Sequence, residues 1–145
     1  MREALEMLRV KRKHVDRMLG VAHLVSTWGS CPPGRRHGCV LADTGKYIVS
    51  TGYNGRKDPC PYAVACVGMR KNEMWRVCKA RHAEENALEN LPRVPFRLLV
   101  AFVTKKPCAV CEQKLRDAGV ARVYWEERTI AGGTLHKGTR LLCTR

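Results

Sequence analysis

The sequence has few acidic residues, few aromatic residues and no long apolar run. Only 13 Asp and Glu residues stand against 27 Lys and Arg residues, so the formal net charge is +14 at pH 7. This excess favours anionic partners such as nucleotide phosphates, a polynucleotide or an acidic protein. A solvated basic surface explains the charge equally well, because the Lys and Arg residues are scattered along the chain rather than gathered in one tail.

The absence of a long apolar run argues against a membrane segment. No uninterrupted stretch is long enough to cross a bilayer, and residues 1–19 mix charges of both signs without the apolar block of a signal peptide. We therefore expect a cytoplasmic protein with no membrane partner. A length of 145 residues suits one compact domain over 1–145. Without a secretion signal, the eight Cys residues are better interpreted as metal ligands and buried thiols than as disulfides.

Two short motifs predict a catalytic metal. His82-Ala83-Glu84 is followed later by Pro107-Cys108-Ala109-Val110-Cys111. One imidazole and two thiolates give zinc three protein ligands and leave the fourth tetrahedral position for water, whose pKa the metal lowers toward neutrality. Glu84 lies two residues past the ligand His82, so it can face the open position as a proton shuttle. The combined pattern is the signature of zinc-dependent nucleobase deaminases.

The chain shows no repeat and no evident linker, and its patterning predicts an α/β fold. Apolar residues at helical spacing indicate an amphipathic helix over 3–28. A hairpin of strands 38–43 and 46–51 follows, and 56–79 is a polar, Cys-rich insert within the domain. The remainder alternates between helix and strand: a helix from about 80 to 91, a strand over 97–103, a helix over 109–118 and a strand over 120–125. This alternation implies βαβ units, with His82 in the first turn of one helix and the Cys pair at the start of the next.

The motifs together resemble a known family. They occur in the order Ser30-Cys31, Arg35-Arg36-x-Gly38, Ser50-Thr51-Gly52-Tyr53-Asn54-Gly55, His82 to Ala87 and Pro107 to Cys111. This order resembles deoxycytidylate (dCMP) deaminases of the bacterial and phage type, within the cytidine deaminase superfamily, from about Ala22 to Trp125. The zinc motifs alone identify only the superfamily, and the Tyr53-Asn54 element narrows the resemblance to the deoxycytidylate branch. The resemblance implies a three-layer αβα fold with a mixed central sheet of about five strands.

The resemblance also implies an activity in pyrimidine deoxynucleotide metabolism. The reaction is hydrolytic deamination of dCMP to dUMP and ammonia, in which zinc-bound hydroxide attacks C4 and Glu84 carries the proton to N3 and then to the leaving amine. The backbone of Ala83 is expected to contact the base, and Asn54 to orient the sugar and base. Arg35 or Arg36 is expected to hold the phosphate through forked hydrogen bonds, the alternative being plain surface charge.

Relatives are commonly homohexamers that dCTP activates and dTTP inhibits. The resemblance therefore implies a homo-oligomer, a hexamer or a dimer, and makes Tyr53 and Asn54 candidates for the effector site. Some bacterial and phage relatives carry a second, structural zinc near the Cys-rich insert. We expect such a zinc on Cys31, Cys60, Cys66 and Cys78, the alternative being four reduced thiols.

The chain departs from the pattern after Glu126. Residues 126–145 contain Gly132-Gly133 and no evident helix, and 141–143 is a candidate edge strand. Three alternatives stay open: a deaminase acting on cytosine or adenine in a polynucleotide, a deaminase acting on dCTP, and a zinc-stabilised nucleic-acid-binding module without turnover. The last predicts that Glu84 is dispensable.

Overall fold

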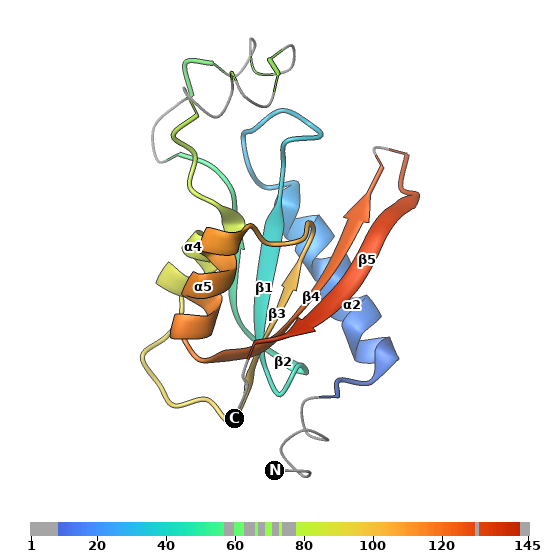
Figure 1. Ribbon diagram of the computed structural model, residues 1–145, viewed down its shortest axis with the longest axis vertical. Helices are drawn as coiled ribbons and strands as arrows, with labels where there is room; N and C mark the ends of the chain where they lie inside the picture. Colours follow the sequence, from blue (N-terminus) through green and yellow to red (C-terminus); the bar gives the residue numbers. More distant parts are fainter. Residues whose placement is uncertain are drawn as a thin grey trace.

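The computed structural model describes residues 9–56, 60–62, 66, 69–70, 73, 78–129 and 131–142. Its centre is one five-stranded sheet in the order β2-β1-β3-β4-β5 (Figure 1). The strands are β1 (Gly38–Asp43), β2 (Tyr47–Tyr53), β3 (Leu99–Val103), β4 (Val120–Arg128) and β5 (Thr134–Leu141). β1 is antiparallel to both β2 and β3, β3 is parallel to β4, and β4 is antiparallel to β5. The sheet is therefore mixed.

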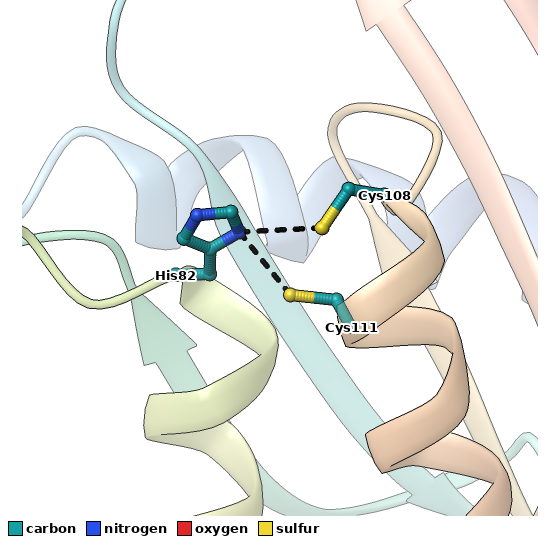
Figure 2. Close-up of side chains that lie close together, drawn as sticks. All are labelled: His82, Cys108 and Cys111. Carbon is teal, nitrogen blue, oxygen red and sulfur yellow. Dashed lines mark hydrogen bonds between the residues drawn. The ribbon is translucent and has the colours of Figure 1, made fainter. Parts of the chain in front are cut away.

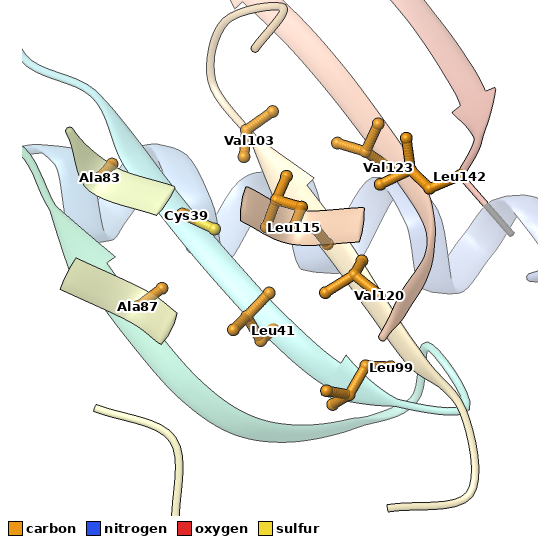
Figure 3. Close-up of a cluster of buried hydrophobic side chains, with 11 residues drawn as sticks. Cys39, Leu41, Ala83, Ala87, Leu99, Val103, Leu115, Val120, Val123 and Leu142 are labelled. Carbon is orange, nitrogen blue, oxygen red and sulfur yellow. The ribbon is translucent and has the colours of Figure 1, made fainter. Parts of the chain in front are cut away.

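Helices cover both faces of this sheet and make three layers. Helix α2 (Arg12–Ser26) lies on one face, and α4 (Ala83–Glu89) and α5 (Ala109–Asp117) lie together on the other (Figure 1). Strand side chains alternate between the faces. In β1, Val40 packs with the α2 core, whereas Leu41 packs with the α4–α5 core (Figure 3). The predicted three-layer αβα fold with about five strands is confirmed.

The strands at the centre of the sheet follow the sequence closely. The predicted strand over 97–103 begins two residues later, at Leu99, and all five of its residues are buried. That run is apolar without alternation because β3 has helices on both faces. Helix α5 matches the prediction to within one residue, and Gly119 follows it with a φ of +86°. This left-handed backbone is what glycine supplies after a helix C-terminus.

Other boundaries also differ from the prediction: β2 spans Tyr47–Tyr53 rather than 46–51, and β4 runs to Arg128 rather than to residue 125. Helix α4 spans Ala83–Glu89 rather than about 80–91, because the backbone of His82 is extended. The first predicted helix begins at Arg12 among the described residues, and its start at residue 3 lies outside them. The insert over 56–79 also lies largely outside the described residues, so the single-domain organisation over 1–145 stays a prediction.

The C-terminal strand lies earlier than predicted. β5 spans Thr134–Leu141 and pairs with β4 as an antiparallel hairpin. The sequence over 134–141 shows little apolar character because this edge strand is mostly exposed. Gly138 of β5 lies opposite Trp125 of β4, and the indole ring packs directly on the glycine. A Cβ at Gly138 would come within 2.3 Å of that ring, so this pairing requires glycine. Among the described residues, no helix is long and apolar enough to cross a membrane.

Candidate metal centre

The two predicted motifs meet at the N-termini of α4 and α5. His82 is the N-cap of α4, with φ −71° and ψ 153°, and Cys108 is the N-cap of α5, with φ −69° and ψ 164°. Extended backbone is usual at an N-cap. The side chains of His82, Cys108 and Cys111 point toward one another across the gap between the two helices (Figure 2). Residues 26 and 29 positions apart in the sequence are thus brought into one cluster.

The spacing of these three side chains fits a zinc ion. His82 Nδ1 lies 3.1 Å from Cys111 Sγ and 3.8 Å from Cys108 Sγ, and the three ligand atoms all lie within 4.8 Å of one another. Tetrahedral zinc with ordinary Zn–N and Zn–S bonds places the nitrogen about 3.5 Å from each sulfur. The observed distances bracket that value. Among the described residues, this is the one group of three or more His, Cys, Asp or Glu side chains with such spacing.

The cluster is open to solvent on one side. His82 and Cys108 are exposed, whereas Cys111 is buried. Burial and the nearby Glu84 carboxylate raise the pKa of the Cys111 thiol. Without metal, this sulfur therefore carries a proton, which metal binding has to release. A site with an exposed rim and a buried floor leaves room for a fourth ligand and a substrate.

Glu84 lies against the buried side of the cluster. Only 7% of the residue is exposed. Burial raises the pKa of the Glu84 carboxyl, while its hydrogen bond with Cys111 acts in the opposite direction. A carboxyl group whose pKa is raised exchanges protons more readily near neutral pH than a solvated one. Its position and environment therefore suit a proton carrier rather than a metal ligand.

The segment that leads into α5 is tied to the central strand β1. Thr104 follows β3, and its backbone N–H donates to the Gly38 carbonyl at 3.1 Å. In return, the Gly38 N–H donates to Thr104 Oγ1 at 3.0 Å. These two bonds continue the β1–β3 pairing past the end of β3. They fix the start of the turn that presents Cys108.

Asn54 is bonded to the loop that precedes β1. Its Oδ1 accepts from the His37 N–H at 2.7 Å, its Nδ2 donates to the Arg35 carbonyl at 2.7 Å, and Nδ2 lies 3.7 Å from Cys31 Sγ. The Asn54 backbone N–H also donates to the His37 carbonyl at 3.1 Å. The side chain predicted to orient the sugar and base therefore holds the loop over 31–37 in place.

The two predicted phosphate ligands also bond to backbone carbonyls. Arg35 Nη2 donates to the Met69 carbonyl at 2.8 Å, and Arg36 Nε donates to the Cys31 carbonyl at 2.5 Å. Both side chains are half-buried rather than fully solvated. Next to them, burial and the charges of Lys105, His82 and Arg35 lower the pKa of His37 to about 4. His37 is therefore neutral at pH 7, and a phosphate would meet the arginines rather than an imidazolium ion.

The four remaining Cys residues predicted to hold a structural zinc are all reduced. Burial, with the neighbouring thiols of Cys78, Cys60 and Cys66, raises the pKa of Cys31. Each of these three thiols therefore lies near Cys31. The four sulfurs do not reach the mutual spacing seen for His82, Cys108 and Cys111.

Sequence reasoning missed several residues that support the centre. Glu85 accepts a hydrogen bond from the His82 N–H at 3.3 Å and another from Lys114 Nζ at 2.9 Å. The spacing from His82 to Glu85 is that of a capping box, which could have indicated this role. Asn86 and Asn90 donate to the Tyr53 and Thr51 carbonyls of β2 at 2.7 and 3.0 Å. Nothing in the sequence alone indicates that pairing.

The sequence pattern of the family described as "Cytidine and deoxycytidylate deaminase zinc-binding region" matches residues 12–127. The chain belongs to this family. The deaminase is 32% identical over 117 residues to an uncharacterized deaminase of Aliivibrio fischeri encoded in the luxG 3' region, covering 81% of this chain and 75% of that protein. It is 33% identical over 116 residues to a probable deoxycytidylate deaminase of Caenorhabditis elegans, covering 80% of this chain and 58% of the nematode protein.

Solved structures agree on the fold of the deaminase. The dCMP deaminase of cyanophage S-TIM5 in its apo form has a TM-score of 0.61 and 25% identity, over 83% of this chain and 88% of the phage chain. The complex of the same phage enzyme with dCMP and dUMP has a TM-score of 0.63 and 22% identity, over 81% and 83% of the two chains. The family is an enzyme family with a zinc-binding region, so the reading as a binding module without turnover is set aside.

Proposed function

We propose that this deaminase converts dCMP and water to dUMP and ammonia, using zinc held by His82, Cys108 and Cys111. The observation that carries the proposal is the convergence of one imidazole and two sulfurs, within 4.8 Å of one another, beside the buried carboxyl of Glu84. The substrate is inferred from relatives: the nematode protein is named a probable deoxycytidylate deaminase, and the phage enzyme was crystallised with dCMP and dUMP.

Zinc, when bound, supplies a Lewis acid that makes water nucleophilic near neutral pH. Glu84 takes a proton from the attacking water and delivers it to N3 of cytosine. It then takes the second proton, from the hydroxyl group now on C4, and gives it to the amino group as the C4–N bond breaks, so that ammonia leaves and the C4 carbonyl of dUMP forms. The raised pKa of the buried Glu84 carboxyl helps it to hold each proton between its uptake and its delivery.

The residues that surround the centre place the nucleotide. Ala83 is the first residue of α4 and lies next to Glu84, and in this proposal its backbone contacts the base. Arg35 and Arg36 each have guanidinium N–H groups beyond those bonded to carbonyls, and these would meet the phosphate. Asn54 orients the sugar either directly or through the loop that it holds.

Ammonia release from a panel of substrates tests this function. The panel is dCMP, dCTP, CMP, deoxycytidine and a cytosine-containing oligonucleotide, with zinc content measured on each preparation. We expect the highest kcat/KM for dCMP. The Glu84→Gln variant should retain its zinc and lose about 10²–10⁴-fold in kcat. A zinc-loaded wild-type protein that releases no ammonia from any of these compounds would refute the proposal.

A polynucleotide substrate is the second candidate. The net charge of +14 favours it, as does the exposure of His82 and Cys108, because an open site admits a base that is part of a long strand. The oligonucleotide in the panel measures this activity directly. Its KM should rise steeply with salt, since strand binding releases counterions, whereas the KM for dCMP should rise only slightly.

We also propose that Cys31, Cys60, Cys66 and Cys78 hold a second, structural zinc. The nearness of the Cys60, Cys66 and Cys78 thiols to Cys31 supports the proposal. Two zinc ions per protomer are expected, and one ion is expected in a Cys78→Ser variant that still deaminates dCMP. A wild-type value of one zinc per protomer would exclude the second site.

We also propose that this deaminase binds nucleotide effectors, forms a homo-oligomer and is located in the cytoplasm. Tyr53 lines a cleft of about 500 Å³ together with Arg56 and with Arg81, which is paired with Glu89, so the cleft offers an aromatic ring and the cation of Arg56 to a nucleoside triphosphate. We expect dCTP and dTTP to shift the dCMP saturation curve in opposite directions, and Arg56→Gln to weaken both effects. Light scattering during gel filtration should show a hexamer or a dimer rather than a monomer.

A further inference from the structure

Glu85 joins the two helices that carry the proposed zinc ligands. One of its carboxylate oxygens accepts the backbone N–H of His82 at 3.3 Å, and the other accepts Lys114 Nζ at 2.9 Å. Glu85 belongs to α4 and Lys114 to α5. Among the ion pairs of the described residues, this is the one that connects α4 to α5.

The position of this ion pair follows from helix geometry. Glu85 lies three residues after His82, and Lys114 lies three residues after Cys111. Residues three apart occupy the same face of a helix, about one turn further along. The faces of α4 and α5 that meet at the metal therefore meet again at the ion pair, one turn behind the ligands. A contact at this place controls how far apart the imidazole and the thiols are held.

The site needs such a control because its two sides come from separate strand–helix units. His82 enters from β2 through the insert, and the Cys pair enters from β3. A change of about 1 Å in helix separation would move the nitrogen-to-sulfur distances of 3.1 and 3.8 Å out of the range around 3.5 Å that zinc requires. Glu85 restrains both sides at once, because it bonds the backbone of one ligand and a side chain one turn below another.

We propose that the Glu85–Lys114 ion pair is a positioning element that sets the affinity of the site for zinc. The proposal rests on the proposed function only in taking zinc as the metal of this site. Glu85 is not one of the three side chains that could hold the metal, and its side chain is 21% exposed against 47% for Lys114. An ion pair with this exposure adds little to the free energy of unfolding, so its effect should appear in metal binding and not in folding.

Zinc affinity in a double-mutant cycle tests the proposal. The metal-free wild type, Glu85→Ala, Lys114→Ala and the double variant are titrated with zinc against a chromophoric chelator. Each single variant should bind zinc about tenfold more weakly, the low end of the effect of outer-shell partners. The double variant should be no weaker than Glu85→Ala alone, because the two groups act as one unit. Raising the salt from 0.15 to 1 M should reduce the difference from the wild type.

Matched controls separate positioning from loss of charge. Glu89→Ala removes a carboxylate from α4 whose partner is Arg81, and Arg116→Ala removes a cation from α5 whose partner is Glu112. Both should bind zinc within twofold of the wild type, and all variants should share the melting temperature of the zinc-free wild type to within a few degrees. The proposal is wrong if the controls lose as much affinity as Glu85→Ala, if the single losses add, or if the variants bind zinc like the wild type. A wild-type protein that binds no zinc would instead refute the proposed function.

Discussion

Gly52 allows helix α4 to lie directly on strand β2, and replacing it should displace this helix, which carries the proposed proton carrier Glu84. A Cβ at this position would lie 2.3 Å from Ala87 N and 2.5 Å from the Ala83 carbonyl oxygen. Ordinary contacts begin at 3.4 Å, so Gly52→Ala requires α4 to retreat by about 1 Å. Both obstacles are backbone atoms, which cannot rotate away. Because α4 carries Glu84 and follows His82, its retreat separates these residues from the thiols of α5.

The expected cost of this change appears in two measurements. Overpacking of this kind lowers the free energy of unfolding by about 1–3 kcal/mol, which urea denaturation measures. A displacement of about 1 Å at the reacting groups lowers kcat/KM by about 100-fold, which ammonia release from dCMP measures. Gly55→Ala is the matched control, because a Cβ there meets nothing within 4 Å. If Gly52→Ala and Gly55→Ala have the same stability and activity, the close approach of α4 to β2 does not position the catalytic residues.

Three further predictions concern charge, pH and metal. Glu126 has a side chain that is 9% exposed among Arg128, Lys137 and His23, so Glu126→Gln should lower the free energy of unfolding by about 1.5 kcal/mol, the contribution of a hydrogen bond to a charged group; an unchanged value in urea denaturation would contradict this. Burial lowers the pKa of His37 to about 4, whereas the unfolded value is about 6.5. Since the unfolded chain takes up the proton first, the zinc-free wild type should lose about 3 kcal/mol between pH 6.5 and pH 4 relative to His37→Gln, and parallel stability curves for the two proteins would refute the assignment. Removal of zinc with a chelator should abolish ammonia release, because the metal is what makes the attacking water nucleophilic near neutral pH; activity that survives chelation would exclude a metal-dependent reaction.

The parts of the fold that were predictable are those with a strong local pattern. The apolar run in β3 and the Pro and Gly residues around α5 define those elements from the sequence alone. The C-terminal hairpin was not predictable in the same way. β5 buries almost nothing of its own, and its place is set by Gly138 lying opposite Trp125, a contact between residues 13 positions apart.

The candidate site likewise has a part that the sequence predicts and a part that it does not. Short motifs predict the positions of His82, Glu84, Cys108 and Cys111, because the type of each ligand and its spacing along a helix can be recognised from neighbouring residues in the sequence. The surroundings depend on tertiary contacts. Asn54 was expected to orient the sugar and base, and the sequence did not indicate that its side chain also bonds the loop over 31–37. The partner of Glu85 lies 29 residues away on another helix. Neither the spacing of apolar residues nor the composition of the sequence predicts these hydrogen bonds between distant residues.

The exposure of His82 and Cys108 has a practical consequence for anyone who prepares this enzyme. Ligands at the surface exchange their ion with whatever the surrounding solution offers, and copper and nickel compete strongly for imidazole and thiolate donors according to the Irving–Williams series. A nickel affinity column or a trace of copper in a buffer would then replace part of the native ion. Specific activity should therefore be normalised to bound zinc rather than to protein mass, and two preparations of identical purity can differ in rate for this reason alone.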